Sequence, residues 1–234
     1  MHQGMIETRI SAGCLLFMHR DCTETQKSDI ADCVLYTQLA ATKKHERFAA
    51  TPAWNETWLA AFTRFGGVLK AHEAISCPAL ELGPGSVWAW MKIRLPLFMP
   101  SDMVFGGESA ARRALSSHPA QPAFDLLAAQ VLEPMTTAIP GEIRIEQKVA
   151  MQIAFLDESA ALSVVLVTFT HRLPLKNDFL FEPLLPGDII GNVELRFYSL
   201  RLMDLVYSPF RQKISQALED RRPHLVSALE GAEA

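Results

Sequence analysis

The stretch Ile143–Phe155, IRIEQKVAMQIAF, carries the clearest strand pattern in the chain. Six apolar residues alternate there with polar ones: Ile143, Ile145, Val149, Met151, Ile153 and Phe155 against Arg144, Glu146, Lys148 and Gln152. Because successive side chains of a strand point to opposite faces of a sheet, this period of two predicts a strand with one apolar and one polar side. We expect the inner side to include Ile145, Val149, Met151 and Ile153.

The residues that follow predict more strands and a last helix. Asp157-Glu158-Ser159 is typical of a turn, and the uncharged segment 162–170 predicts a central strand that completes a hairpin. Another strand is expected after Pro186-Gly187-Asp188. Ser208 is expected to cap the last helix, with Pro209 at its first position.

The chain before Pro140 favours helices. Ser28 and Asp29 are suitable caps for a helix that runs to about Lys44. The next segment, TPAWNETWLAAFTRFG, places its four large aromatic side chains within an arc of about 80° on a helix, which indicates a face buried in the core rather than a ligand platform: Trp54, Trp58, Phe62 and Phe65. An extended segment over 68–76 and two more helices are also expected, over 108–115 and 124–132.

Together these patterns predict an α+β fold. We expect a helical N-terminal half packed on a C-terminal antiparallel sheet, with a covering C-terminal helix. No linker, repeat or low-complexity tract interrupts the chain, so a single domain over residues 1–234 is expected, helix-rich over 1–140 and strand-rich over 141–234.

Composition and charge exclude several classes of protein. Hydrophobic residues make up 49% of the chain and charged residues 21%, which are ordinary globular values. The net charge of −4 gives no basic footprint for nucleic acid. Two short basic runs, Lys43-Lys44-His45 with Arg47 and Arg221-Arg222, are interpreted as solvated helix ends.

Targeting and cysteine patterns point to an ordinary cytoplasmic protein. The first residues lack the basic start and long apolar run of a secretory signal, so the cytoplasm is the expected location, with leaderless export as the alternative. The four cysteines form no C-x-x-C pair, so neither a zinc site nor a disulfide scaffold is predicted. Cys33 and Cys77 are interpreted as buried free thiols.

Catalytic motifs are absent from the sequence. No phosphate-binding loop, nucleophile elbow or H-E-x-x-H motif occurs, and the seven histidines are scattered, so no cofactor and no metal is predicted. The best of a weak set of catalytic candidates is His171, which ends the apolar strand and leads into a loop that contains Asp178 and Asp188. A lone histidine is more often structural, and that interpretation is favoured here.

One segment resembles a known group of proteins. The helix Leu35–Lys44, LYTQLAATKK, followed by Trp54, Trp58, Phe62 and Gly66-Gly67, is similar to an uncharacterised set of microbial proteins. These share an L-Y-x-Q-L-A-A-x-K-K helix, spaced aromatic residues and a glycine. The resemblance implies helices first and strands later, and it implies no activity.

Three functional hypotheses follow. The first is a non-enzymatic binding or interaction protein of unknown protein or small-molecule partner, with action on another cell included. The second is an enzyme with a dispersed site near His171 and Asp188. The third is a lipid-contacting or membrane-active protein, carried by the apolar and aromatic segment 86–99, which includes Lys92 and Arg94. Burial in the core is the simpler interpretation of that segment.

Overall fold

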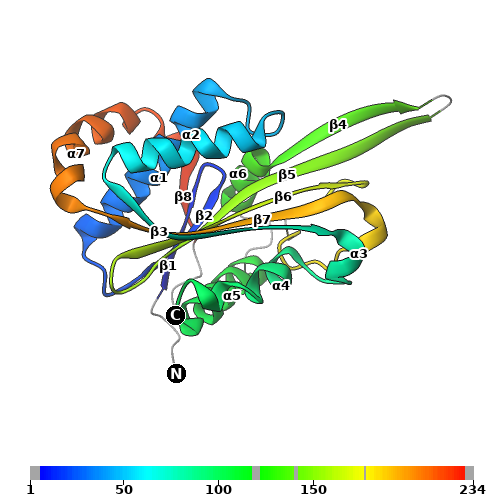
Figure 1. Ribbon diagram of the computed structural model, residues 1–234, viewed down its shortest axis with the longest axis horizontal. Helices are drawn as coiled ribbons and strands as arrows, with labels where there is room; N and C mark the ends of the chain where they lie inside the picture. The colour runs from blue at the N-terminus through cyan, green and yellow to red at the C-terminus, as the bar shows by residue number, and fades with distance from the viewer. Residues whose placement is uncertain (1–5, 118–121, 140–141, 177, 230–234) are drawn as a thin grey trace.

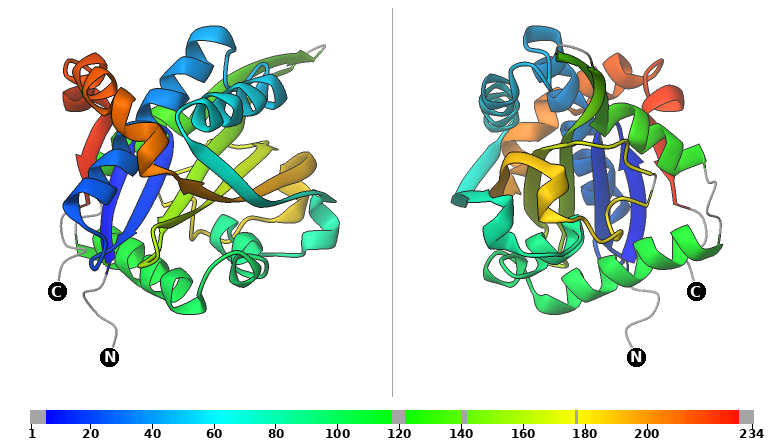
Figure 2. Two further views of the ribbon diagram at one scale, coloured as in Figure 1. Left: turned by 60° about the vertical axis from the view of Figure 1, so that its left-hand side comes forward. Right: turned by 90° about the vertical axis from the view of Figure 1, so that its right-hand side faces the viewer.

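The computed structural model describes residues 6–117, 122–139, 142–176 and 178–229, and it shows one sheet with helices on both faces (Figure 1; Figure 2). The strands are β1 (Ile6–Ser11), β2 (Cys14–His19), β3 (Gly67–Pro78), β4 (Leu132–Ile139), β5 (Glu142–Leu156), β6 (Ala161–His171), β7 (Ile189–Leu202) and β8 (Val226–Ala228). The helices are α1 (Glu24–Lys44), α2 (Thr51–Arg64), α3 (Ala79–Leu82), α4 (Val87–Lys92), α5 (Ser101–Ser117), α6 (Pro122–Val131), α7 (Asp204–Leu218) and α8 (Arg222–Leu225), with short 3-10 turns η1 (Leu95–Leu97) and η2 (Pro186–Asp188). The predicted α+β class is confirmed.

The predicted hairpin forms the middle of the sheet. β5 and β6 pair antiparallel, and the strand order across the sheet is β3-β7-β6-β5-β2-β1-β8. On the edge of β5 that faces away from β6, two strands pair with it in turn: β4 along its first part and β2 along its last part. The C-terminal strands β5, β6 and β7 pair antiparallel, as expected, and β2 from the N-terminal part of the chain joins β5 in parallel.

Helices cover both faces of the sheet, which changes the predicted burial of its strands. α1, α2 and α7 pack on one face and α4 and α5 on the other, as Figure 1 shows, and the buried residues of α6 belong to the same core as those of α4 and α5. Val149, Met151 and Ile153 are buried on the inner side as predicted, but Gln152 and Ala154, on the opposite side, are buried as well. Ile145 is 54% exposed, and it lies in the part of β5 that pairs with β4 but not with β6, since the β5–β6 pairing begins at Gln147.

The N-terminal part of the chain also contributes strands to the sheet. β1 and β2 form an antiparallel hairpin, and every residue of β2 is buried. A continuous apolar run such as Cys14–Met18 suits a strand covered on both faces, but its periodicity does not distinguish a strand from a buried helix. β3 and β4 also belong to this half, and β3 includes the predicted extended segment 68–76.

Two predicted helix starts are wrong. α1 begins at Glu24 because Thr23 and Gln26 form a capping box, so Ser28 and Asp29 lie inside the helix. α7 begins at Asp204, and Pro209 lies inside it. Arg211 of α7 donates two hydrogen bonds of 2.7 Å to the Asp29 carboxylate and thereby ties the last long helix to the first.

The aromatic stripe of α2 is confirmed as a core face. Trp54, Trp58 and Phe62 are fully buried against the sheet and α1, while Phe65 at the helix end is half-buried. Trp58 contacts the ring of Tyr198 in β7, with the ring centroids 5.6 Å apart. The stripe therefore anchors α2 and leaves no aromatic platform for a ligand.

Arg47 is not part of a solvated basic run. Its guanidinium is buried, donates to Gln38 Oε1 at 2.5 Å and to the carbonyl of Gln130 at 3.3 Å, and lies 4.3 Å from the centre of the Trp54 ring. Burial lowers the pKa of this guanidinium to about 10, so it remains charged at neutral pH. Arg47 therefore joins α1, α2 and the end of α6.

All four cysteines are free, as expected. Cys33 is buried within α1, whereas Cys77, near the end of the edge strand β3, is only half-buried. Among the described helices, none combines the length and the apolar character that crossing a lipid bilayer requires.

Candidate functional site

His171 and Asp188 come close in the backbone but form no contact through their side chains. His171 ends β6 with 6% of its surface exposed, and its Nδ1 lies 2.7 Å from the carbonyl oxygen and 3.2 Å from the backbone nitrogen of Leu173. Asp188 directly precedes Ile189, the strand partner of His171, and its carbonyl oxygen accepts from the N–H of Arg172 at 2.7 Å. Asp178 lies in the turn before Phe181. A catalytic role for His171 stays a prediction.

Two shallow clefts lie elsewhere on the surface, and His171 lines neither. One, of about 220 Å³, lies between the N-terminal end of α2 and strands β5, β6 and β7. The other, of about 290 Å³, lies between the first turns of α1 and the start of α7, where Asp29 and Asp204 contribute to its wall. Both carboxylates are bound by Arg211. The carboxylates in the wall of the second cleft are therefore already paired, and neither is free to bind a cationic ligand.

An exposed apolar surface lies over α4, η1 and α5. The segment 86–99 is mostly core, since Trp88, Trp90, Met91 and Leu95 are buried. The opposite side of the same segment carries Ile93 and Leu97, which are 75% and 69% exposed, and Phe105 of α5 is 57% exposed. Ile93 is the C-cap residue of α4, and Leu97 is the last residue of η1. We call Ile93, Leu97 and Phe105 the α4–α5 apolar surface.

Charged side chains border this surface. The Lys92 ammonium lies 4.7 Å from the centre of the Phe105 ring and donates to Glu108 at 2.7 Å. Glu108 also bonds Arg112, and these two cations lower the pKa of its carboxyl against the opposing effect of burial. Arg94 is exposed and forms no ion pair with any residue in the described ranges. Lys92 and Arg112 are therefore paired with Glu108, whereas Arg94 is unpaired among the described residues.

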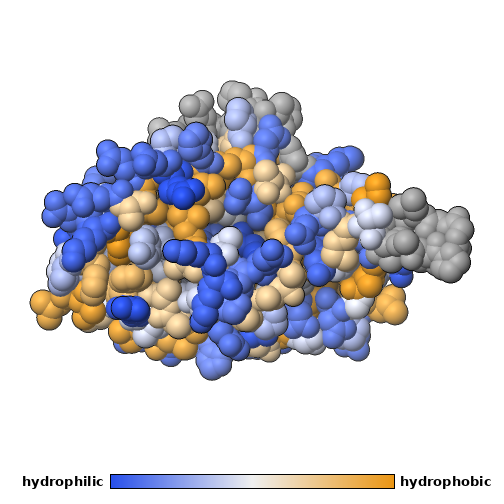
Figure 3. Space-filling view, turned by 90° about the horizontal axis from the view of Figure 1, so that it is seen from above, coloured by the Kyte–Doolittle hydropathy of each residue, from blue (hydrophilic) through white to orange (hydrophobic). Residues whose placement is uncertain are grey.

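Other exposed apolar side chains are spread over the molecule. Leu205 of α7 is 86% exposed, and Leu80 of α3 and Leu185 before η2 are exposed as well. The face on the α1–α2 side mixes hydrophilic and hydrophobic residues (Figure 3). Single exposed apolar residues are common on proteins, whereas a group bordered by charge indicates an interaction site.

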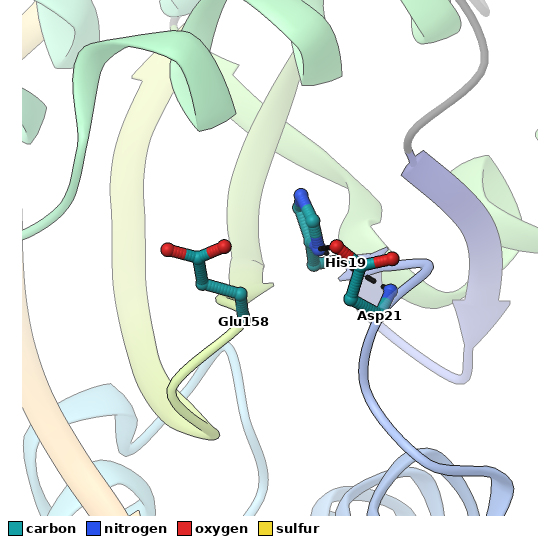
Figure 4. Close-up of side chains that lie close together, drawn as sticks. All are labelled: His19, Asp21 and Glu158. Carbon is teal, nitrogen blue, oxygen red and sulfur yellow. Dashed lines mark hydrogen bonds and ion pairs between the residues drawn. The ribbon is translucent and has the colours of Figure 1, made fainter.

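A second group of functional side chains lies at one end of the sheet. Figure 4 shows His19 at the end of β2, Asp21 just after it and Glu158 in the β5–β6 turn. One potential ligand atom from each residue lies within 4.8 Å of the others. His19 is buried, and the two carboxylates are exposed. In the described part of the chain, these are the three residues whose side chains could share a metal ion.

Comparisons with known proteins give little guidance. No family model and no curated protein matches the chain. Among solved structures, the activated Cyt2Ba monomer from Bacillus thuringiensis subsp. israelensis is similar, with a TM-score of 0.45 and 10% identity over 83% of this chain and 99% of that one. A delta-endotoxin gives a TM-score of 0.45 and 8% identity over 82% of each chain. At such scores the likeness does not establish a function for this chain.

Sequence reasoning pointed to the right segment for the apolar surface but to mostly the wrong residues. Within the segment 86–99, Trp88 and Trp90 are core, whereas Ile93 is exposed. The sequence held one signal for the exposed residues, namely the apolar pair Ile93 and Leu97, which are spaced four residues apart. His19 and Glu158 had no such signal, since they are far apart in the chain and only the pairing of β2 with β5 joins them.

Proposed function

We propose that the protein acts by binding rather than by catalysis, and that the α4–α5 apolar surface binds it to lipid surfaces. The observation that carries this proposal is the exposure of Ile93, Leu97 and Phe105 on a segment whose other side is packed in the core. The scaffold under the surface is fixed, because Trp88 and Leu95 hold the segment against the sheet. The surface therefore presents apolar side chains without unfolding.

The charged border favours a lipid interface over a protein partner. Segments that lie in the headgroup region of a membrane combine aliphatic and aromatic side chains with Lys or Arg, whose long stems keep the charge near the headgroups. Arg94 lies between Ile93 and Leu97 in the chain, and Lys92 lies over Phe105. An anionic headgroup would meet Arg94, and Lys92 where it exchanges its bond to Glu108 for the headgroup, while the three apolar side chains enter the acyl boundary.

The expected affinity is modest. Fully burying a large apolar side chain contributes about 1.5–3 kcal/mol, so three that are already partly covered contribute about 3–6 kcal/mol together. Each cation near an anionic membrane adds about 1 kcal/mol and is sensitive to salt. The proposal therefore predicts reversible binding that is stronger on anionic vesicles than on neutral ones.

Vesicle co-sedimentation tests the proposal. Wild-type protein is expected to sediment with vesicles of phosphatidylglycerol and phosphatidylcholine, and less with phosphatidylcholine alone. The double variant Ile93→Asp, Leu97→Asp should lose binding at least tenfold, because it places two charges in the acyl boundary. Leu205→Asp, which changes an even more exposed leucine on the opposite side of the sheet, should bind like wild type.

Two results would overturn the proposal. One is vesicle binding that survives the double Ile93 and Leu97 change, and the other is an equal loss in Leu205→Asp. Self-association is the main alternative use of such a surface, and analytical ultracentrifugation distinguishes it. A dimer that Ile93→Asp converts to a monomer, with no vesicle binding in either form, would assign the surface to a second copy of the chain.

A further inference from the structure

The parallel pairing of β2 with β5 brings His19, Asp21 and Glu158 together. Met18 is the strand partner of Leu156, so the residues that follow each strand leave the sheet side by side. The carboxyl ends of neighbouring parallel strands are a common position for ligand sites in sheets covered on both faces. His19 follows Met18 directly, and Glu158 lies just beyond Leu156 in the turn (Figure 4).

Both loops are held in place by their own hydrogen bonds. The Asp157 carboxylate accepts from the Ser159 N–H, the Ser159 hydroxyl and the Ala161 N–H, at 2.7–2.9 Å. The Cys22 thiol donates to the Asp157 carbonyl oxygen at 3.0 Å and so connects the β2–α1 loop to the β5–β6 turn. The three functional side chains therefore start from backbone positions that are already fixed.

The buried imidazole of His19 is the observation that points to a ligand. His19 is only 7% exposed, yet its single hydrogen bond is a long one, in which the Asp21 N–H donates to Nδ1 at 3.3 Å. Nδ1 also faces the Asp21 carboxylate, whose Oδ2 lies 3.7 Å away (Figure 4). A buried polar group normally has its hydrogen bonds satisfied, and Nδ1 has only these two long contacts in the described ranges, so it has capacity for a further partner that it shares with the carboxylate.

Charge indicates that the partner is a cation. Asp21 and Glu158 bring two carboxylates close to the imidazole, and neither forms an ion pair with a lysine or arginine in the described ranges. A cation between them would replace the repulsion of two like charges with attraction.

We propose that His19, Asp21 and Glu158 bind a divalent transition metal, with Zn²⁺ as the preferred ion. One imidazole nitrogen and two carboxylates suit zinc, whereas Ca²⁺ and Mg²⁺ select oxygen ligands. Tetrahedral zinc needs ligand atoms about 3.4 Å apart. The three ligand atoms lie within 4.8 Å of one another and both carboxylates are exposed, so binding requires these two side chains to move closer, and a fourth position is open to water.

Isothermal titration calorimetry with Zn²⁺, on the full chain with Cys77→Ser, tests this proposal. The background change removes the one cysteine that is not buried. One equivalent of Zn²⁺ is expected to bind, with Ca²⁺ and Mg²⁺ at least a hundredfold weaker. Glu158→Gln should weaken Zn²⁺ binding at least tenfold, and His19→Ala further. His72→Ala, an exposed histidine on β3 beside Glu73, should leave it unchanged.

Because Glu158 is exposed, Glu158→Gln is expected to fold. It therefore tests the site even if His19→Ala, which changes a buried residue, fails to fold. Circular dichroism checks the fold of each variant. Two results would remove the site: no heat of Zn²⁺ binding at 100 µM protein, or binding that Glu158→Gln leaves within twofold of wild type.

Discussion

Val149→Asp is expected to unfold most of the protein at neutral pH. Val149 is buried between Leu132 of β4 and Phe169 of β6, and both of these cross-strand partners are uncharged. An unpaired carboxylate in such a site costs several kcal/mol, which is comparable to the whole stability of a typical domain. Urea unfolding followed by circular dichroism should show a loss of at least about 4 kcal/mol in the free energy of unfolding.

Ile145→Asp is the matched control for this change. Ile145 lies four residues before Val149 in β5, on the same side of the strand, and more than half of its surface is exposed. The same substitution there should cost less than about 1 kcal/mol. Equal losses at the two positions would mean that the register of β5 is wrong.

The effect of Val149→Asp should also depend on pH in a defined direction. Burial raises the pKa of a carboxyl above its unfolded value of about 3.9. The folded variant therefore binds the proton more tightly than the unfolded chain does, so stability is lost as the pH rises above about 4. The deficit relative to wild type should shrink as the pH falls toward 4, and a deficit that grew there would contradict this account.

Trp58→Ala should lower the free energy of unfolding by about 3–5 kcal/mol. The indole is fully buried and contacts the rings of Phe62 and Tyr198, so its removal leaves a cavity between α2 and β7. Surrounding side chains relax only in part, because protein interiors are close-packed. Urea denaturation gives the loss directly, and near-ultraviolet circular dichroism reports the change in aromatic packing.

Glu56→Ala controls for changes in α2 itself, since Glu56 is exposed on the same helix. It should change stability by less than about 0.5 kcal/mol. If Trp58→Ala were equally mild, the aromatic stripe would not anchor α2 to the sheet.

The parts of the fold that could be predicted from sequence are those with a regular period. The β5–β6 hairpin and α2 were both identified, because alternation and a helical stripe are strong local signals. The β2 strand was missed because burial on both faces removes its alternation. The parallel β2–β5 pair was missed for another reason: pairing between segments far apart in the chain leaves no local pattern.

The candidate sites also differ in whether a local sequence pattern reveals them. The apolar segment 86–99 was visible in sequence, but which of its side chains face outward depends on where the segment packs against the sheet. His19 and Glu158 each looked ordinary, the first as a scattered histidine and the second as a turn residue. Only the shared end of two parallel strands makes them neighbours.

The most direct test of lipid binding places a reporter in the apolar surface. Leu97→Cys in a Cys77→Ser background provides an accessible thiol for an environment-sensitive nitrobenzoxadiazole label, because Cys14, Cys22 and Cys33 are buried. Leu205→Cys, labelled in the same way, reports from α7 on the opposite face of the sheet. Anionic vesicles should shift the emission of the label at position 97 to shorter wavelength and raise its intensity several-fold, with little change at position 205. An unchanged spectrum at position 97 in excess vesicles, or the same change at both positions, would contradict a lipid contact through Ile93, Leu97 and Phe105.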